Sequence, residues 1–75
     1  MPPREQGAPY KRIAAAIRER IESGELAPGE QVPSATELQD EYGVSRNTAL
    51  RALKTLRDEG LIVVEQGWGS FVAGP

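Results

Sequence analysis

The sequence predicts an α+β fold that is mainly α-helical, with three helices followed by a C-terminal β-hairpin. Three observations support this prediction. Apolar residues recur at helical spacing in the first third of the chain. Two short helical segments then meet at a corner that contains Gly43, and two β-branched segments near the C-terminal end are joined by glycines. With 75 residues, 39% of them hydrophobic and 27% charged, the chain can form one small globular domain, which we place at residues 9–75.

The first helix is predicted to begin at Pro9 and to end before Gly24. Proline costs little in the first turn of a helix, where its missing N–H has no partner, and glycine commonly follows a helix end. The apolar face of this helix is expected in the core and contains Tyr10, Ile13, Ala14, Ile17 and Ile21. Residues 1–8 are rich in proline and glycine and lack periodicity, so they are predicted to form a flexible arm.

The central segment, residues 34–57, predicts two helices joined at a corner. Ser34 can cap the first of them, and Glu37 stands where it completes a capping box. Gly43 is suited to end that helix in the left-handed conformation, and Ser45 can cap the next one. Two short helices with a glycine-containing turn between them are typical of a helix-turn-helix.

The second of these helices has two distinct faces. Its apolar arc, expected in the core, contains Ala49, Ala52, Leu53 and Leu56. Asn47, Arg51 and Lys54 share the opposite side, and residues 44–57 carry four cations and no acid. Arg and Asn can hydrogen-bond base edges, and Thr and Lys suit phosphates, so this face is suited to the major groove of DNA. The alternative is a solvated amphipathic helix whose cations only maintain solubility.

The remaining segments predict a short sheet beside the helices. Pro28-Gly29 is suited to a type II turn, and the extended piece that follows near Val32 is expected to pair with a later strand. Residues 61–65 and 70–73 predict two strands joined by a glycine-containing turn over 66–69. A hairpin alone is marginally stable, so it should pack on the helices. This order of elements is that of a winged helix-turn-helix.

Composition limits the possible functions. The chain has no cysteine and no histidine, so disulfides are excluded and any metal or nucleophilic chemistry would depend on carboxylates; we predict no enzymatic activity and no cofactor. No membrane span or signal peptide is recognisable, and a cytoplasmic, nucleoid-associated protein is expected. The net charge of −2 is unusual for a nucleic-acid-binding domain, but outside residues 44–57 the balance is −6, so the cations are concentrated on one helix.

The ordered motifs resemble the N-terminal DNA-binding domain of the GntR family of bacterial transcription regulators. The resemblance runs from about Pro9 to Val72 and is carried by SGELAPGEQVPS, YGVSRNTALRAL, EGL and QGWGSFV. The last of these and the single Pro-Gly turn are most similar to the HutC-type branch. The resemblance implies a sequence-specific regulator, in most cases a repressor, that binds a palindromic operator in double-stranded DNA. It also implies a C-terminal domain that binds an effector and dimerises the protein, so this domain alone should be a monomer that pairs weakly on DNA.

By this resemblance, the predicted DNA-binding residues lie on three elements. Arg46 would read a guanine, while Ser45, Asn47 and Thr48 would hold phosphates or base edges. The glycines of the wing would let the backbone approach the minor groove. The complete predicted set is Ser34, Thr36, Ser45, Arg46, Asn47, Thr48, Arg51, Lys54, Gly67, Trp68 and Gly69.

The chain departs from the family pattern at four positions. The family usually has Arg where Thr36 stands, often has Arg where Leu50 stands, and commonly has basic residues where Glu65 and Trp68 stand. Helical geometry turns Arg51 outward instead of Leu50, and we favour Arg51 as the second base reader.

Trp68 has two interpretations. The first, which we favour, is that its indole covers Tyr10 or Leu61; the second is that it contacts sugar edges or a partner. The negative charge and an exposed Trp68 would also suit a protein-interaction module that does not bind DNA, which is the alternative function.

Overall fold

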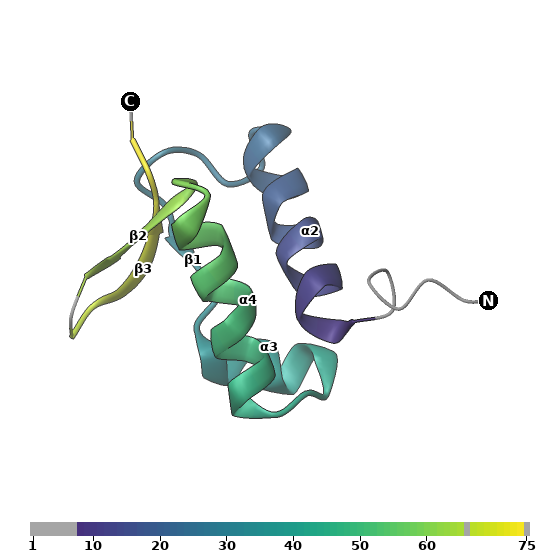
Figure 1. The fold of residues 1–75 in the computed structure, drawn as a ribbon. Coiled ribbons are helices and arrows are strands. Elements are labelled where there is room, and N and C mark those ends of the chain that lie inside the picture. Colours follow the sequence, from purple (N-terminus) through teal and green to yellow (C-terminus); the bar gives the residue numbers. More distant parts are fainter. Residues whose placement is uncertain (1–7, 66, 75) are drawn as a thin grey trace.

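The computed structural model describes residues 8–65 and 67–74 and confirms the predicted order of elements. The predicted arm, residues 1–8, lies outside the described residues apart from Ala8. The elements shown in Figure 1 are α2 (Pro9–Glu22), β1 (Gln31–Val32), α3 (Ala35–Tyr42), α4 (Arg46–Asp58), β2 (Ile62–Glu65) and β3 (Gly69–Val72). None of the described helices is both long and apolar enough to cross a membrane.

Helices α2 and α4 pack side by side and run in the same direction (Figure 1). Near their C-terminal ends, Arg18 donates from Nε and Nη2 to the Glu59 carboxylate at 2.9 and 2.7 Å, and this bond raises the pKa of Arg18. This two-point pair is half-exposed, so it fixes the geometry more than it adds stability. The buried apolar side chains come from all elements and are Ile13, Ala14, Ile17, Leu26, Val32, Ala35, Leu38, Ala49, Ala52, Leu53, Leu56, Ile62 and Val72.

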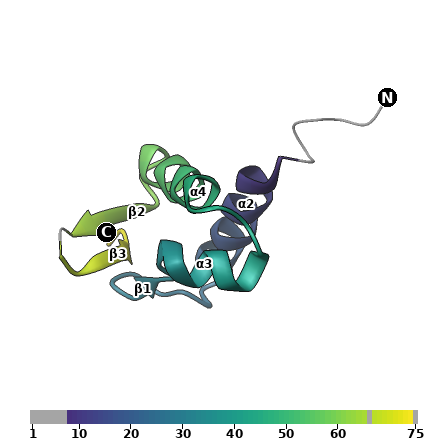
Figure 2. The same cartoon turned by 90° about the horizontal axis from the view of Figure 1, so that it is seen from below.

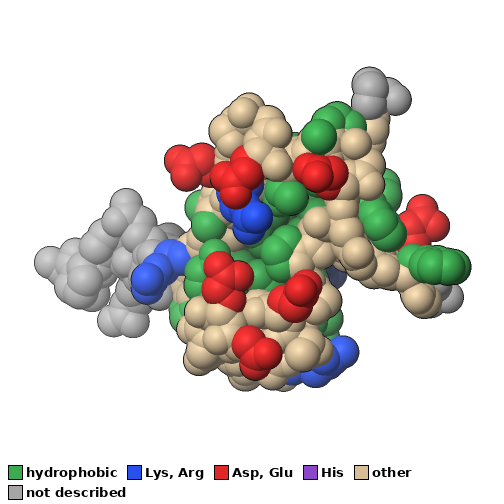
Figure 3. All heavy atoms as spheres, turned by 180° about the vertical axis from the view of Figure 1, so that it is seen from behind, with side chains coloured by type: hydrophobic (Ala, Val, Ile, Leu, Met, Phe, Trp, Pro, Cys, Tyr) green, Lys and Arg blue, Asp and Glu red, His purple; other side chains and the backbone are tan. Residues whose placement is uncertain are grey.

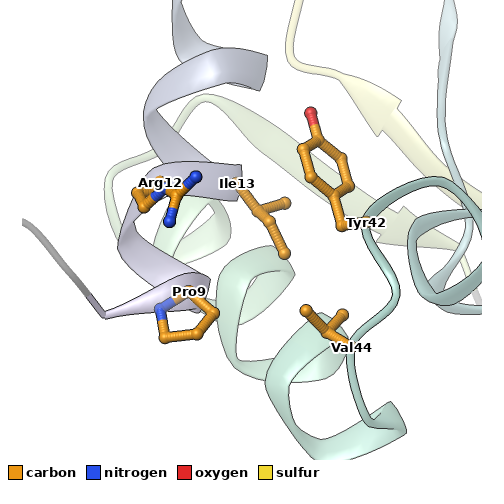
Figure 4. A pocket seen from close by; sticks show the side chains of 5 residues that line it. All are labelled: Pro9, Arg12, Ile13, Tyr42 and Val44. Atoms are coloured by element: carbon orange, nitrogen blue, oxygen red, sulfur yellow. The ribbon is translucent and has the colours of Figure 1, made fainter.

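The corner between α3 and α4 has the predicted geometry. The Glu37 N–H donates to Ser34 Oγ at 3.1 Å, and the Ser34 N–H donates to Glu37 Oε1 at 2.8 Å, which completes the capping box. Gly43 ends α3 in the left-handed conformation with φ 66°, which glycine adopts without the steric cost of a Cβ. Val44 then packs against the core. Figure 4 shows it beside a hollow of about 190 Å³ between α2 and this corner, lined by Pro9, Arg12, Ile13, Tyr42 and Val44.

The three strands form an antiparallel sheet with the order β1-β3-β2. Val32 is opposite Ser70, and Glu65 is opposite Gly69 at the outer end of the hairpin. The expected pairing of the Val32 segment with a later strand is therefore confirmed. Ile62 and Val72 are buried on the helices, whereas the outer end of the hairpin projects away from them (Figures 1 and 2).

Acidic side chains are carried mainly by elements other than α4. Asp and Glu side chains are spread over the face turned away from the viewer in Figure 1, which Figure 3 shows directly. On α3, Glu37, Asp40 and Glu41 are all exposed. The cations of α4 thus lie on a domain whose other elements are mainly acidic, as predicted.

Candidate nucleic-acid interface

The N-terminal end of α4 is fixed by a cap. Ser45 has an extended backbone, and its Oγ accepts the Thr48 N–H at 3.2 Å. The Ser45 hydroxyl and the Thr48 hydroxyl lie 3.1 Å apart and are hydrogen-bonded to each other. A serine in this position satisfies one of the free N–H groups of the first turn. The cap therefore orders the turn that carries Arg46 and Asn47.

The two faces of α4 are arranged as predicted. Ala49, Ala52 and Leu56 are fully buried and Leu53 nearly so, which fixes the rotation of the helix on the core. Arg46 and Asn47 are exposed, and neither makes a side-chain hydrogen bond or an ion pair to another described residue. Two groups that can both make two-point contacts with bases thus stand free at the helix start.

Arg51 and Leu50 lie on different sides of the exposed face. The Arg51 guanidinium carbon lies 4.4 Å from the centre of the Tyr10 ring on α2. Leu50 is 43% exposed and lines a hollow between α4 and the hairpin together with Val64. Both side chains therefore reach the surface, with Arg51 on the α2 side and Leu50 on the wing side.

The described cations divide into paired and free groups. Lys54 Nζ lies 2.9 Å from the Asp58 carboxylate, and Arg57 lies 3.9 Å from the same group. The hydrogen bond from Lys54 lowers the pKa of Asp58, so this carboxylate is charged at neutral pH. By contrast, no described carboxylate lies within ion-pair distance of Lys11, Arg12, Arg46 or Arg51. Lys11, Arg12 and Arg46 belong to the first turns of α2 and α4, where the helix dipoles add further positive potential, and Arg51 lies one turn further along α4.

Ser34 and Thr36 stand on a separate element, the start of α3. The Ser34 oxygen is occupied by the capping box, and Ser34 is half-buried. Thr36 is exposed in the first turn. These two residues belong to the start of α3, whereas Ser45, Arg46, Asn47, Thr48 and Arg51 belong to the cap and first two turns of α4.

The wing tip is held by a contact from β1. Gln31 Nε2 donates to the Trp68 carbonyl at 3.0 Å, and the Trp68 N–H donates to the Glu65 carbonyl at 2.9 Å. Gly69 has φ 116°, and a Cβ at this position would lie 2.6 Å from Gln31 Nε2. The backbone conformation accounts for a glycine at position 69, and a side chain there would also displace the exposed Gln31 amide.

The favoured interpretation of Trp68, that its indole covers Tyr10 or Leu61, is wrong. Trp68 is 76% exposed. It lies in the turn, beyond the last strand pair Glu65–Gly69, whereas Leu61 precedes the other end of β2. The antiparallel register thus separates the indole from Leu61 by the length of the hairpin.

Three contacts of this surface were not predicted from the sequence. The Lys54–Asp58 pair has an i,i+4 spacing, which is a recognisable signal, but the helix was expected to end at Arg57. The Arg51–Tyr10 and Gln31–Trp68 contacts join residues far apart in the chain, and no local pattern indicates them.

Comparison with known proteins identifies relatives over almost the whole chain. The histidine utilization repressor of Klebsiella aerogenes is 49% identical over 74 residues, which are 97% of this chain and 31% of that protein. The mannosyl-D-glycerate transport/metabolism system repressor MngR of Escherichia coli is 44% identical over 84% of this chain and 26% of its own length. The chain thus spans less than a third of these relatives. A histidine utilization repressor among them agrees with the expected HutC-type branch.

Solved structures share the fold. AraR(DBD) in complex with operator ORR3 is 35% identical with a TM-score of 0.83, over 87% of this chain and 78% of that one. YtrA from Sulfolobus acidocaldarius, a GntR-family transcription factor, is 42% identical with a TM-score of 0.81, over 88% of this chain and 69% of its own. The family of bacterial regulatory proteins named gntR matches residues 9–72. The fold, the ordered motifs and this match agree, and the chain belongs to the GntR family.

Proposed function

We propose that this domain binds double-stranded DNA in a sequence-specific manner as part of a transcriptional repressor. The observation that carries the proposal is the capped start of α4, where Arg46 and Asn47 are exposed and unpaired among the described residues. A helix with free two-point donors at its N-terminal end is suited to the major groove. The relatives are named as repressors, and the AraR domain was solved with its operator.

We assign individual roles from the resemblance to the GntR family together with the positions of the residues. Arg46 reads a guanine, Asn47 contacts a base edge or a phosphate, and Ser45 and Thr48 contact phosphates beside their capping hydrogen bonds. Ser34 and Thr36 approach the backbone from the start of α3. Gly67 and Gly69 let the wing backbone come close to the minor groove, where Trp68 packs on sugar edges.

The free cations set the salt dependence. Lys11, Arg12, Arg46 and Arg51 have no carboxylate partner among the described residues, whereas Lys54 must exchange Asp58 for a phosphate. Each domain should neutralise about 3–5 phosphates, so binding should weaken steeply as salt rises. The acidic side chains elsewhere on the surface lower non-specific affinity, but salt screens them from the positive potential around these cations.

The domain is expected to act in pairs. Two copies would occupy a palindromic operator with half-sites about 10 base pairs apart, or a multiple of this spacing. The domain alone should be a monomer that pairs weakly on DNA. In a longer protein of the size of the relatives, effector binding and stable dimerisation would belong to the remaining part. We place the protein in the cytoplasm, at the nucleoid, and assign it no catalytic role.

Selection of bound sequences from a random DNA pool, followed by footprinting of the winner, tests the proposal. Enrichment of a palindrome, with protection of two successive major grooves, is the expected result. A pool that shows no enrichment after repeated rounds at low salt would contradict sequence-specific binding.

The alternative, a protein-interaction module, makes a different prediction. Titration with duplex DNA, followed by amide shifts, should move the signals of residues 45–54. Shifts confined to the wing and α2 would favour the alternative instead.

A further inference from the structure

Tyr10 and Arg51 meet on the α2 side of the candidate interface. The guanidinium carbon lies 4.4 Å from the centre of the ring, within the range of a cation–π contact. Tyr10 is half-buried and packs against the core, so the ring itself is fixed. A hollow of about 270 Å³ opens beside the pair and is lined by Ala8, Pro9, Tyr10, Asn47, Thr48 and Arg51.

The contact determines where Arg51 can act. It draws the guanidinium toward α2, while the exposed neighbour Leu50 lies on the wing side. Lys11 and Arg12 follow Tyr10 in the first turn of α2 and are exposed. Arg51 therefore lies against the first turn of α2, which carries two further cations, an arrangement that suits a DNA backbone passing along α2.

The contact also leaves Arg51 competent to bind. A guanidinium above a ring makes the contact through its π-face and keeps its N–H donors available at its edge. Arg51 donates no side-chain hydrogen bond to another described residue. An arginine held in one place before binding loses less side-chain entropy when it meets a phosphate.

We propose that Tyr10 is a positioning residue, which holds Arg51 ready for a sequence-independent contact with a DNA phosphate at the α2 edge of α4. This inference rests on the proposed DNA-binding function and deepens it. It assigns discrimination between bases to Arg46 and Asn47, and it replaces the expectation that Arg51 is the second base reader.

The test uses the variants Arg51→Ala, Tyr10→Leu, Tyr10→Phe and the double variant Tyr10→Leu/Arg51→Ala. Each is titrated with the selected operator and with a random duplex at several salt concentrations. Arg51→Ala should weaken binding to both duplexes by a similar factor and lower the salt slope by about 0.9. Tyr10→Leu should weaken both by roughly 2- to 10-fold, while its salt slope is unchanged because no charge is lost. Tyr10→Phe keeps the ring and should bind like wild type.

The double variant separates positioning from folding. If Tyr10 acts through Arg51, the double variant binds like Arg51→Ala, within about twofold. If Tyr10 only supports the fold, Tyr10→Leu weakens binding equally in both backgrounds, and the inference is overturned. Denaturation of each variant shows whether the leucine, which retains the apolar packing, has preserved the fold. NMR relaxation of the Arg51 Nε–H adds a readout independent of affinity and should show greater mobility in Tyr10→Leu than in Tyr10→Phe.

Two further outcomes distinguish this inference from the proposed function. An Arg51→Ala variant that changes the preferred base at one position, while its affinity for the random duplex is unchanged, would make Arg51 a base reader. A wild-type domain without affinity for any duplex would overturn the proposed function itself, before any variant is made.

Discussion

The start of α4 and the tip of the wing are both exposed, but they differ in charge and in the contacts that fix them. The start of α4 carries charge: Arg46 and Arg51 have no carboxylate partner among the described residues, and the helix is fixed by the Ser45 cap and a buried apolar face. The described part of the wing tip carries Glu65 and the indole of Trp68, and its shape depends on the hydrogen bond from Gln31.

This difference separates two contributions to binding. Electrostatic affinity and its salt dependence should come from the helices, because the free cations lie there. The wing should contribute shape, through a turn that exposes backbone and a large ring. Substitutions in the two regions should consequently change different measured quantities.

The largest expected effect is that of Arg46→Ala. Loss of a two-point contact to a base should weaken operator binding by about 1–3 kcal/mol and relax discrimination at one base pair. Competition binding with single-base operator variants measures both quantities. Arg20→Ala is a charge-matched control, because Arg20 lies on α2 and is paired with Glu25 in the loop that follows, and it should leave discrimination intact. An Arg46→Ala variant that discriminates between bases as well as wild type would contradict the assignment of base reading to the start of α4.

Gly69→Ala should disturb the wing and leave α4 unchanged. The new Cβ would displace Gln31, and the left-handed backbone adds strain, so the unfolding free energy should fall by about 1–3 kcal/mol. Chemical denaturation gives this value, and amide shifts show which region moves. Gly67→Ala is the matched control: its φ is 83°, but no atom lies within 4 Å of the added Cβ, so it should report backbone strain alone. Shifts that spread through α4 would show that the two regions are coupled.

Trp68→Lys should add an electrostatic contribution of the wing to DNA binding. The added cation should steepen the salt slope by about 0.9 and tighten binding to any duplex. Trp68→Ala is the companion variant: it removes the ring without changing charge, so the slope should stay constant. Because the indole is 76% exposed, its removal should change stability by no more than about 0.5 kcal/mol. A larger loss of stability would indicate that the ring packs on the domain.

Asp58→Asn should have the smallest effect. The carboxylate pairs with Lys54 and lies near Arg57, so its removal frees both cations for phosphates. Binding to random duplex at low salt should tighten only slightly, because an exposed ion pair contributes little. The low pKa of Asp58 implies that the pair persists at neutral pH and is released only as acid protonates the carboxylate. Glu22→Gln, on α2, is the control: it changes the net charge by the same amount and should tighten duplex binding less than Asp58→Asn does.

The fold and the family were predicted correctly because their signals are local. Ser34 with Glu37, Gly43, and Ser45 mark the corner through capping chemistry that depends on residues three positions apart. The positions of apolar residues on α2 and α4 followed from helical periodicity and are confirmed by burial. The DNA-binding roles of individual residues remain predictions.

The wrong interpretation of Trp68 and the contact of Arg51 that was not predicted both concern segments distant in the sequence. The position of Trp68 depended on the hairpin register, and the partner of Arg51 is on another helix. Neither the position of Trp68 nor the partner of Arg51 is indicated by the residues that neighbour them in the sequence. The pairing of Lys54 with Asp58 was within reach of sequence reasoning, and it was missed because the helix was ended one residue early.

The backbone of Gly69 also has an evolutionary consequence. With φ 116°, an alanine or serine at position 69 would be strained whatever residue stands at position 31, whereas the Gln31 amide, 2.6 Å from the added Cβ, ends an exposed side chain that can move aside. Family members should therefore keep glycine at the equivalent of 69 even where the residue at the equivalent of 31 is short.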